Sequence, residues 1–345
     1  MIGRRSLLTG TGATILGAPT AGIPIAGGPV LAGSTMAATL LAPRGAHARR
    51  FLTMITGASA GSGGDAIARS FALFLGRHLG GVEIQVRNLP GDGGLTALNA
   101  LADAPPSGAT IGWVATPALA ARAVDRSDPA LASRLTLLGA VEREPIAFIA
   151  SAADPLDSVR DILQRASQDS GTMPLGTPPP GSPAHLAALR LQLMTRTRLN
   201  IIAFPSAPAA RQALLGGNVA AAALGLSDVI AALREEKLVG LGIAARKRSG
   251  ILPDLPVLSE AGVPLSAWIR RGLAVPTGTS PEMMAPLIKA LRAIAGDPAF
   301  REQAETQGLL AAWNDGPSWT AQVGLEREEL ATLWAADPWL NAAGQ

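Results

Sequence analysis

The stretch from Gly57 to Asp65 consists of small residues and one acid, a composition suited to contact with an anion. Glycine has no side chain, so the backbone of such a loop can come close to a ligand. An apolar run of strand length, 51–56, precedes the loop, and apolar residues at helical spacing follow it. The first turn of a helix carries N–H groups without partners, which attract negative charge. The pattern predicts either an anion-binding loop or an ordinary turn between a strand and a helix.

Known nucleotide-binding motifs do not fit this loop. A P-loop requires a lysine that reaches the phosphates, and the segment 57–65 contains none. The dinucleotide fingerprint requires a third glycine, but Gly61-Ser62-Gly63 is followed by Gly64-Asp65-Ala66. A small anion therefore remains the expected ligand. We expect Asp65, near the helix start, to cap the helix and to favour its dipole.

A second strand, loop and helix of the same kind occupies residues 173–194. Its loop contains three consecutive prolines, and Ser182 followed by Pro183 is typical of a helix N-terminus. His185 follows Ser182 by three residues, a spacing open to a nucleophile with its base or to a cap with a local hydrogen bond. No G-x-S-x-G elbow accompanies the pair, so we expect the cap and no catalytic residue.

Composition excludes several classes of site. The chain has no cysteine and only three histidines, so we expect no disulfide, no thiolate or histidine-rich metal site and no cofactor. Residues 1–48 carry the entire formal net charge of +3, and acids and bases balance in the rest of the chain. A nucleic-acid-binding protein would show a basic stripe in its folded part, so we expect no nucleic-acid partner.

Residues 1–48 have the features of an export signal. Arg4-Arg5 precede a mildly apolar, glycine-rich stretch, which favours the twin-arginine route, and Ala46-His47-Ala48 is a cleavage pattern. A Sec signal or a membrane anchor remains an alternative, although glycine and proline interrupt the apolar run repeatedly. We expect a soluble, periplasmic and monomeric protein whose signal is cleaved near Ala48.

The remaining chain alternates strands and helices, which predicts an α/β fold of two domains with parallel-rich sheets flanked by helices. Strands are expected at 51–56, 82–86, 110–115, 135–141, 146–150, 201–204, 219–224, 239–244 and 268–275. Helices are expected at 95–104, 208–215, 228–237 and 281–295. Three more are expected to begin at residues 66, 117 and 157, and a further one is expected to end at about residue 194. Thr116 is expected to be the N-cap of the helix that Pro117 opens. Two helices, 298–307 and 317–335, are expected to finish the chain.

Six collinear segments resemble one known family over essentially the whole chain after residue 48. They are 60–69 (AGSGGDAIAR), 88–94 (NLPGDGG), 106–110 (PSGAT), Gly181-Ser182 with His185-Leu186, 214–219 (LLGGNV) and 253–262 (PDLPVLSEAG). These segments are similar to motifs of the substrate-binding proteins of tripartite tricarboxylate transporters, the Bug or TctC-like family of periplasmic binding proteins.

The resemblance implies a two-domain, Venus-flytrap fold of the type II periplasmic binding proteins. It places domain 1 at residues 49–144 and 264–345 and domain 2 at residues 145–263. It also implies a small carboxylate held between the domains, largely by backbone N–H groups and water, and a membrane transporter or a sensor as the partner. Carried onto this chain, the expected ligand-binding positions are Ser59, Ala60, Gly61, Ser62, Gly63, Gly64, Asp65, Thr116, Thr177, Gly181, Ser182, His185, Phe204 and Ser206.

Three positions depart from the family pattern. Leu95 replaces an asparagine, Phe204 stands within an altered P-Y-x-G segment, and Leu224 replaces a frequent acid. Each change puts an apolar residue near the expected cleft. We therefore hypothesise a ligand less polar than a tricarboxylate, such as a monocarboxylate with an apolar body.

Two alternative functions remain open. The first is an α/β enzyme, a hydrolase or transferase. Such an enzyme can have the same alternation of strands and helices, and fold does not fix function. A sensor accessory would bind the same ligand but present it to a receptor kinase. Arg143 and Arg270-Arg271 flank the expected domain crossovers, and we expect them to be solvated charges rather than ligand contacts.

Overall fold

The computed structural model describes residues 51–154, 156–169, 171 and 173–340. The predicted export signal, its cleavage position and its route lie outside these residues. Within the described part, no helix is both long enough and apolar enough to cross a bilayer.

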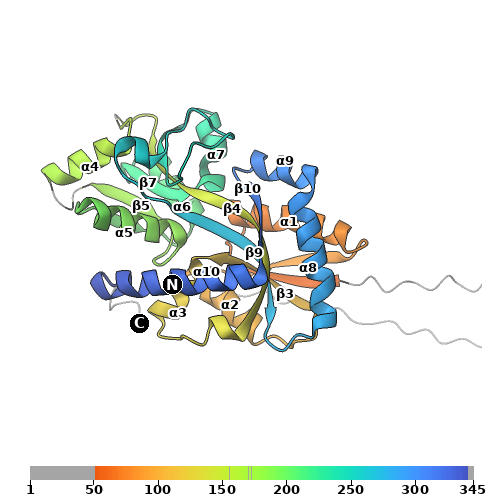
Figure 1. Ribbon diagram of the computed structural model, residues 1–345. Helices are drawn as coiled ribbons and strands as arrows, with labels where there is room; N and C mark the ends of the chain where they lie inside the picture. The colour runs from red at the N-terminus through yellow and green to blue at the C-terminus, as the bar shows by residue number, and fades with distance from the viewer. Residues whose placement is uncertain (1–50, 155, 170, 172, 341–345) are drawn as a thin grey trace, which may run out of the picture. The chain divides into compact units, whose positions relative to one another are not determined.

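The described chain alternates strands and helices, as predicted, around one mixed sheet (Figure 1). The strands are β1 (Phe51–Thr56), β2 (Glu83–Asn88), β3 (Thr110–Thr116), β4 (Leu135–Ser151), β5 (Pro174–Thr177), β6 (Asn200–Ala203), β7 (Ala221–Gly225), β8 (Leu238–Ile243), β9 (Trp268–Pro276) and β10 (Leu310–Asp315). The α-helices are α1 (Gly63–His78), α2 (Leu95–Ala102), α3 (Ala118–Asp125), α4 (Val159–Gln168), α5 (Pro183–Thr195), α6 (Ala207–Leu215), α7 (Leu226–Arg234), α8 (Pro281–Gly296), α9 (Pro298–Thr306) and α10 (Gly316–Ala336).

The strand order is β2-β1-β3-β9-β4-β7-β5-β6, and β8 and β10 also pair with β4. Parallel pairs lie toward the two ends of this order, where β1 pairs with β2 and β3, and β5 pairs with β6 and β7. The pairs made by β4 and β9 in the middle are antiparallel. The alternation of strands and helices thus holds, but the strands that link the two ends of the sheet do not belong to parallel β-α-β units.

One long strand replaces the two strands expected at 135–141 and 146–150. β4 runs without a break from Leu135 to Ser151 and exchanges partners along its length, with β9 and β10 up to Pro145 and with β7 and β8 from Ile146. The charged residues 142–144 and Pro145 lie between the two expected strands. They are accommodated because Glu142 lies opposite Arg271 of β9, and because Pro145 stands where the partners change.

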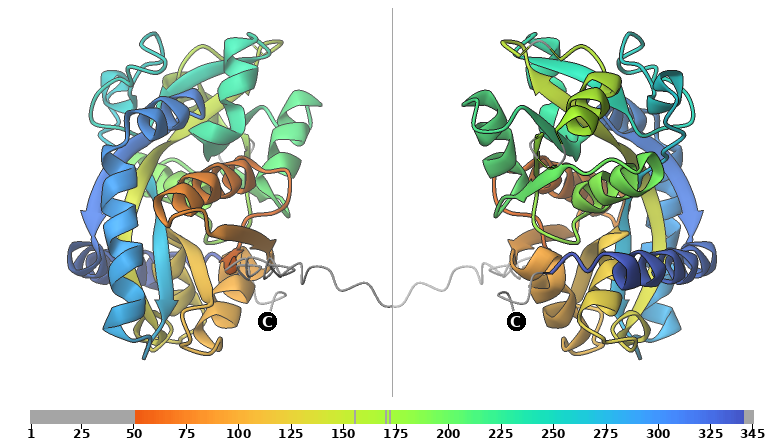
Figure 2. Two further views of the ribbon diagram at one scale, coloured as in Figure 1. Left: turned by 90° about the vertical axis from the view of Figure 1, so that its right-hand side faces the viewer. Right: turned by 90° about the vertical axis from the view of Figure 1, so that its left-hand side faces the viewer.

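The exchange at Pro145 divides the sheet into two parts. We call lobe A the part with β1, β2, β3, β9, β10 and residues 135–145 of β4, together with α1–α3 and α8–α10. Lobe B contains β5–β8, residues 146–151 of β4, and α4–α7. In lobe A, one hydrophobic cluster lies between the sheet and α1, α8 and α9. Another lies between the sheet and α2, α3 and α10, and it includes Leu186 and Leu189 of α5. Figure 2 shows the helices around the strands from two further sides. Two further clusters form most of the core of lobe B.

The C-terminal region contains a strand that was not expected. β10 lies between α9 and α10 and pairs antiparallel with β4, with an irregular register. Its sequence lacks the strict alternation that marks a half-buried strand, so only the pairing with β4 reveals it. Asp315 is then the N-cap of α10, and its carboxylate accepts the backbone N–H of Ser318 at 2.8 Å.

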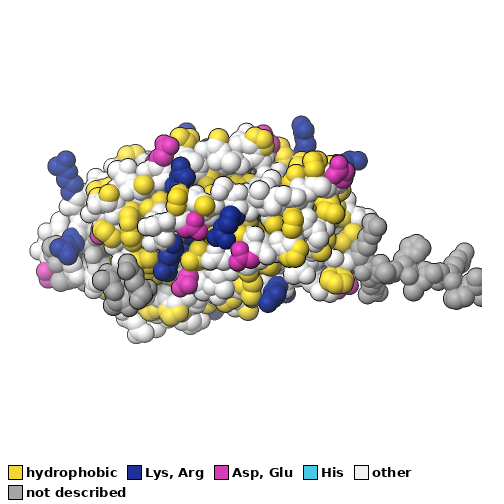
Figure 3. Space-filling model, turned by 90° about the horizontal axis from the view of Figure 1, so that it is seen from below, with side chains coloured by type: hydrophobic (Ala, Val, Ile, Leu, Met, Phe, Trp, Pro, Cys, Tyr) yellow, Lys and Arg dark blue, Asp and Glu magenta, His cyan; other side chains and the backbone are white. Residues whose placement is uncertain are grey.

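The surface shows both signs of charge. On the face in Figure 3, lysine and arginine side chains are interspersed with acidic and hydrophobic ones, and they form no continuous stripe. The described residues also contain no group of histidine, cysteine and acidic side chains arranged to hold a metal ion.

Candidate functional site

A cavity of about 520 Å³ lies between lobe A and lobe B. Four loop segments contribute to its lining: 57–64 and 90–94 from lobe A, and 178–184 and 205–207 from lobe B. Three of the helices that follow these loops, α1, α5 and α6, begin at the cavity. The loops that the sequence singled out are therefore brought together, although more than a hundred residues separate them.

Each of these three helices begins with a serine N-cap. The hydroxyl of Ser62 accepts the N–H of Asp65 at 3.2 Å, and that of Ser182 accepts the N–H of His185 at 3.4 Å. Ser206 caps α6 in the same way. The predicted cap at Ser182 with Pro183 in the first turn is confirmed. In α1 the N-cap is Ser62, so the capping role expected of Asp65 was assigned to the wrong residue.

Asp65 instead fixes the shape of the Gly57–Gly64 loop. One carboxylate oxygen accepts the N–H of Gly61 at 3.0 Å, and the other accepts from Asn88 at 2.8 Å and pairs with Arg69 at 3.0 Å. Burial alone would raise the pKa of Asp65, but these hydrogen bonds and the arginine outweigh it, and the net effect lowers the pKa. Asp65 is thus ionised at neutral pH, and its carboxylate holds the Gly57–Gly64 loop in place.

His185 and Ser182 do not form a nucleophile and base. The N–H of Gly181 approaches Nδ1 of the His185 ring at 3.4 Å, and Ser182 is engaged with the backbone of α5. Burial, reinforced by nearby Arg122, lowers the pKa of His185 to about 4, so the imidazole is neutral at physiological pH. The pair has the capping arrangement that we expected.

Several backbone N–H groups at the cavity have no hydrogen-bond acceptor within the described part of the chain. They include those of Ser59 and Gly64 in lobe A and of Ala184 and Ala207 in lobe B, four residues that line the cavity. Gly64, Ala184 and Ala207 lie in the first turns of α1, α5 and α6, where intrahelical acceptors are missing. The helix dipoles add partial positive charge at the same points. These groups can receive an anion from both lobes.

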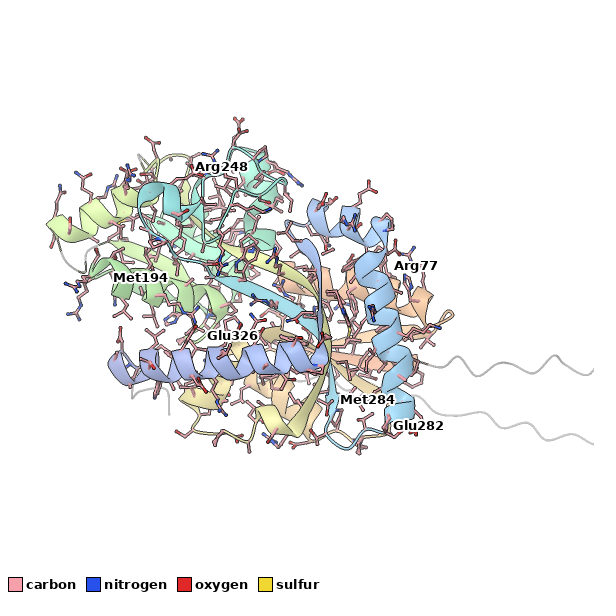
Figure 4. All side chains as sticks on the ribbon, viewed as in Figure 1. Arg77, Met194, Arg248, Glu282, Met284 and Glu326 are labelled. Atoms are coloured by element: carbon pink, nitrogen blue, oxygen red, sulfur yellow. The ribbon has the colours of Figure 1, made fainter. Side chains whose placement is uncertain are left out.

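Arg271 contradicts the expectation of a solvated charge. Its side chain is 8% exposed, lines the cavity and pairs with Glu144 and, at 3.6 Å, with Glu142. Burial raises the pKa of Glu142 to about 8, although Arg271 acts in the opposite direction. Arg143 stacks on the Trp268 ring, and Arg270 pairs with Glu326 of α10 at 3.3 Å. Figure 4 shows Glu326 on α10.

Arg122 and Asp228 are two charged cavity residues that the sequence analysis missed. Arg122, on α3, is fully buried with Asp125 and donates to the carbonyl oxygens of Asp92 at 2.9 Å and Pro180 at 3.0 Å. Asp228, on α7, accepts the N–H of Gly63 at 2.9 Å. Both side chains therefore connect lobe A with lobe B. The sequence signal available for Arg122 was an aspartate three residues later within an apolar helix.

The structure separates the expected ligand-binding residues into two groups. Those that line the cavity are Ser59, Ser62, Gly64, Ser182 and Ser206. Those outside its lining are Ala60, Gly61, Gly63, Asp65, Thr116, Thr177, Gly181, His185 and Phe204. Thr116 is not the N-cap of α3, because the N-cap is Pro117; the Thr116 hydroxyl instead accepts the indole N–H of Trp319 at 3.2 Å. Thr177 is fully buried and donates to the Pro178 carbonyl.

The three departures from the family pattern do not change the cavity wall. Leu224 is fully buried in the core of lobe B, Phe204 packs against the same cluster, and Leu95 packs against a cluster of lobe A. None of the three lines the cavity. Apolar lining comes instead from other residues, among them Leu98, Leu101 and the prolines 178–180.

Comparison with known proteins places the chain in a family. The sequence pattern of the tripartite tricarboxylate transporter family receptors matches residues 67–323. A UPF0065 protein of Bordetella bronchiseptica is 27% identical over 286 residues, which cover 82% of this chain and 84% of that protein. A UPF0065 protein of Cupriavidus necator is 26% identical over 267 residues, 75% of this chain and 80% of that protein.

Solved structures show the same fold. The periplasmic binding protein BugD matches with a TM-score of 0.76 and 24% identity, over 83% of this chain and 97% of that one. A TctC solute-binding protein from Polaromonas matches with a TM-score of 0.63 and 26% identity, over 84% and 99%. The Rpa4515 protein of R. palustris, solved with adipate, matches with a TM-score of 0.77 and 23% identity, over 84% and 97%. The fold is that of the periplasmic binding proteins, and the chain belongs to the tripartite tricarboxylate transporter receptor family.

Proposed function

We propose that this protein is a periplasmic receptor that captures a small organic carboxylate between its lobes and delivers it to a membrane transporter of the tripartite tricarboxylate type. The observation that carries the proposal is the set of unpaired N–H groups of Ser59, Gly64, Ala184 and Ala207 around one cavity. They come from both lobes, so a bound anion gives the closed arrangement contacts that an open one lacks. Binding then shifts the population toward closure.

The cavity suits an organic anion better than an inorganic one. Its volume of about 520 Å³ is within the range of small-molecule sites, and apolar residues alternate with the polar loops around it. Among the structural relatives, MatC of Rhodopseudomonas palustris was solved with malate and Rpa4515 with adipate. The carboxylate groups of such ligands are what helix N-termini bind.

Within this proposal the domains keep the boundaries expected from the sequence, with 49–144 and 264–345 in one and 145–263 in the other. Residues 1–48 act as the export signal, and the mature protein is periplasmic. The protein binds and releases its ligand without catalysis, because Ser182 and His185 are engaged with the N-terminus of α5. Of the predicted positions, Ser59, Ser62, Gly64, Ser182 and Ser206 contact the ligand.

Isothermal titration of the mature chain, residues 49–345, tests this function. The panel contains citrate, malate, adipate, a linear aliphatic monoacid and benzoate, with the dication putrescine as a negative control. We expect one binding site for at least one acid and none for putrescine. Binding of putrescine alone, or of no acid in the panel, would contradict the proposal.

Removal of one unpaired donor tests the role of the amide groups. Ala207 is the first residue of α6, follows an extended Ser206 and lacks an acceptor for its N–H, so proline fits there without loss of a helical hydrogen bond. We expect Ala207→Pro to weaken the affinity by about 10-fold or more, because hydrogen bonds to charged groups contribute about 1.5–3 kcal/mol. Ala207→Ser retains the N–H and is the matched control. Equal affinities for the two variants would exclude a contact between this amide and the ligand.

A further inference from the structure

Asp228 brings a negative charge into a cavity that otherwise offers donors. It is the third residue of α7, on lobe B, and it lines the cavity. The other acidic residue in the lining, Asp92, has a largely exposed side chain near Arg126. A negative charge at this position opposes the binding of an anion, so Asp228 is expected to have a separate role in ligand binding.

One oxygen of Asp228 is already engaged. Oδ1 accepts the N–H of Gly63, the first residue of α1, at 2.9 Å. Glycine is required there because a Cβ on residue 63 would lie 2.7 Å from the Ser227 hydroxyl and 2.9 Å from Oδ1. The carboxylate of Asp228 thus occupies one of the donor positions at the N-terminus of α1, and the loop is shaped to admit it.

The second oxygen of Asp228 has no hydrogen-bond partner among the residues that the structure describes. It is also not an enclosed atom, since Asp228 is partly exposed and lines the cavity. The neighbouring acid, Glu144, is engaged with the N–H of Ser227 at 2.7 Å and with Arg271. An acceptor oxygen of Asp228 is therefore left for a ligand.

The position of this oxygen relative to the anion site determines what it can select. The N–H of Gly64, next to Gly63 in the first turn of α1, is unpaired and at the cavity. A ligand carboxylate bound to Gly64 lies beside Asp228. A second carboxylate placed near that oxygen would be repelled. A hydroxyl or ammonium group on the carbon next to the bound carboxylate would donate to it.

We propose that Asp228 is a specificity-determining residue that selects acids with a hydrogen-bond donor, hydroxyl or ammonium, on the carbon next to the carboxylate. This inference rests on the proposed function as a carboxylate receptor. An acid without this donor displaces the water that hydrates the Asp228 oxygen but forms no hydrogen bond to that oxygen in its place. It therefore binds more weakly. A site that is built to hydrogen-bond a ligand group discriminates strongly against the analogue that lacks it.

Titration of matched ligands with the mature protein tests the inference. Two scaffolds are used: succinate with malate and aspartate, and 3-phenylpropionate with 3-phenyllactate and phenylalanine. We expect a donor-bearing member of one scaffold to bind wild type at least about 10-fold more tightly than its deoxy parent. If malate or phenyllactate is the tightest ligand, the selected donor is a hydroxyl, and if aspartate or phenylalanine is, it is an ammonium group.

Asp228→Asn isolates the residue. Asparagine retains an oxygen for the N–H of Gly63 but presents an NH₂ group in place of the second oxygen. We expect the preference for the donor-bearing acid to fall to within about 2-fold of unity, whereas Asp103→Asn, an exposed acid paired with Arg134, should leave it unchanged. A retained preference in Asp228→Asn would overturn the assignment.

The ratios of ligand affinities measured with the wild-type protein test the inference even if Asp228→Asn does not fold. Deoxy acids that bind wild type as tightly as their hydroxy and amino relatives overturn this inference and leave the carboxylate receptor intact. Absence of binding by every acid overturns both.

Discussion

Glu142 shows how the environment of one side chain determines the response of the whole protein to pH. It is buried in β4, and its pKa is raised to about 8 by burial, which the neighbouring Arg271 only partly offsets. The folded protein therefore holds this proton at pH values at which the unfolded chain has released it. Such a group stabilises the folded state at low pH, and its contribution is lost as the pH rises from 4.5 toward 8.

We expect Glu142→Gln to reduce the pH dependence of the free energy of unfolding. Glutamine resembles the protonated acid in size and remains neutral. Between pH 5 and pH 8, wild type should lose roughly 3 kcal/mol more stability than the variant. Urea unfolding at the two pH values measures the difference. Because Asp228 and Glu326 also have raised pKa values and are present in both proteins, only the difference between the two curves is assigned to Glu142. Parallel curves would show that Glu142 is ionised throughout.

The residues that could be predicted are those with a local signal. Ser182 before Pro183 predicts a helix cap, and the glycines of 57–64 predict a loop, because both depend on the chain immediately around them. Arg271, Arg122 and Asp228 could not be placed in this way. Their neighbours come from distant parts of the chain, so nothing close to them in sequence distinguishes a buried ion pair from a solvated charge.

Among the elements, α5 is determined by local sequence signals, whereas β4 depends on contacts with distant parts of the chain. α5 has a cap, a first-turn proline and apolar residues at helical spacing, and its start was predicted to the residue. β4 contains three charged residues and a proline between its two apolar halves, and the sequence alone reads them as a break. What keeps the strand continuous is its pairing with β9, which lies more than a hundred residues later.

The close approach of β4 and β9 gives a prediction about Gly272. A Cβ on this residue would collide with the backbone of Gly139 and Ala140 on β4, which cannot move away as a flexible side chain can. We expect Gly272→Ala to destabilise the protein by about 1–3 kcal/mol, as overpacking in a core typically does.

Gly324, within α10, is the matched control, because a Cβ there meets no atom within 4 Å. Gly324→Ala should stabilise the protein by about 0.4–1 kcal/mol through a lower entropy of the unfolded chain and better helix propensity. Urea unfolding of both variants measures the two effects. A neutral Gly272→Ala would mean that the two strands separate easily at this point.

At the scale of the whole described unit, several side chains join the two lobes. Asp228 accepts the N–H of Gly63, and Arg122 donates to the carbonyl oxygen of Pro180. α10 extends from lobe A alongside lobe B, where Glu329 pairs with Arg190 of α5 at 3.2 Å (Figure 1). The α/β fold class was predictable from the alternation of strands and helices and from the family motifs. These cross-contacts were not, because they form only when both lobes are folded.

Arg122 allows the contribution of one such contact to closure to be measured. Its guanidinium pairs with Asp125 and at the same time donates to one carbonyl of each lobe, Asp92 in lobe A and Pro180 in lobe B. Lysine retains the charge beside Asp125 but is a single point charge and cannot reproduce the planar fork. Arg122→Lys should therefore remove the link between the lobes without leaving Asp125 buried and unpaired.

We expect the unliganded Arg122→Lys protein to have a larger radius of gyration than wild type in small-angle X-ray scattering, and a saturating carboxylate to bring both proteins to the same value. Affinity should fall several-fold, in proportion to the smaller population of the closed state. Arg134→Lys is the control, since its partners Asn99, Asp103 and Asp128 all lie in lobe A. An unchanged radius together with an unchanged affinity would show that Arg122 serves the packing of α3 and not the closure of the lobes.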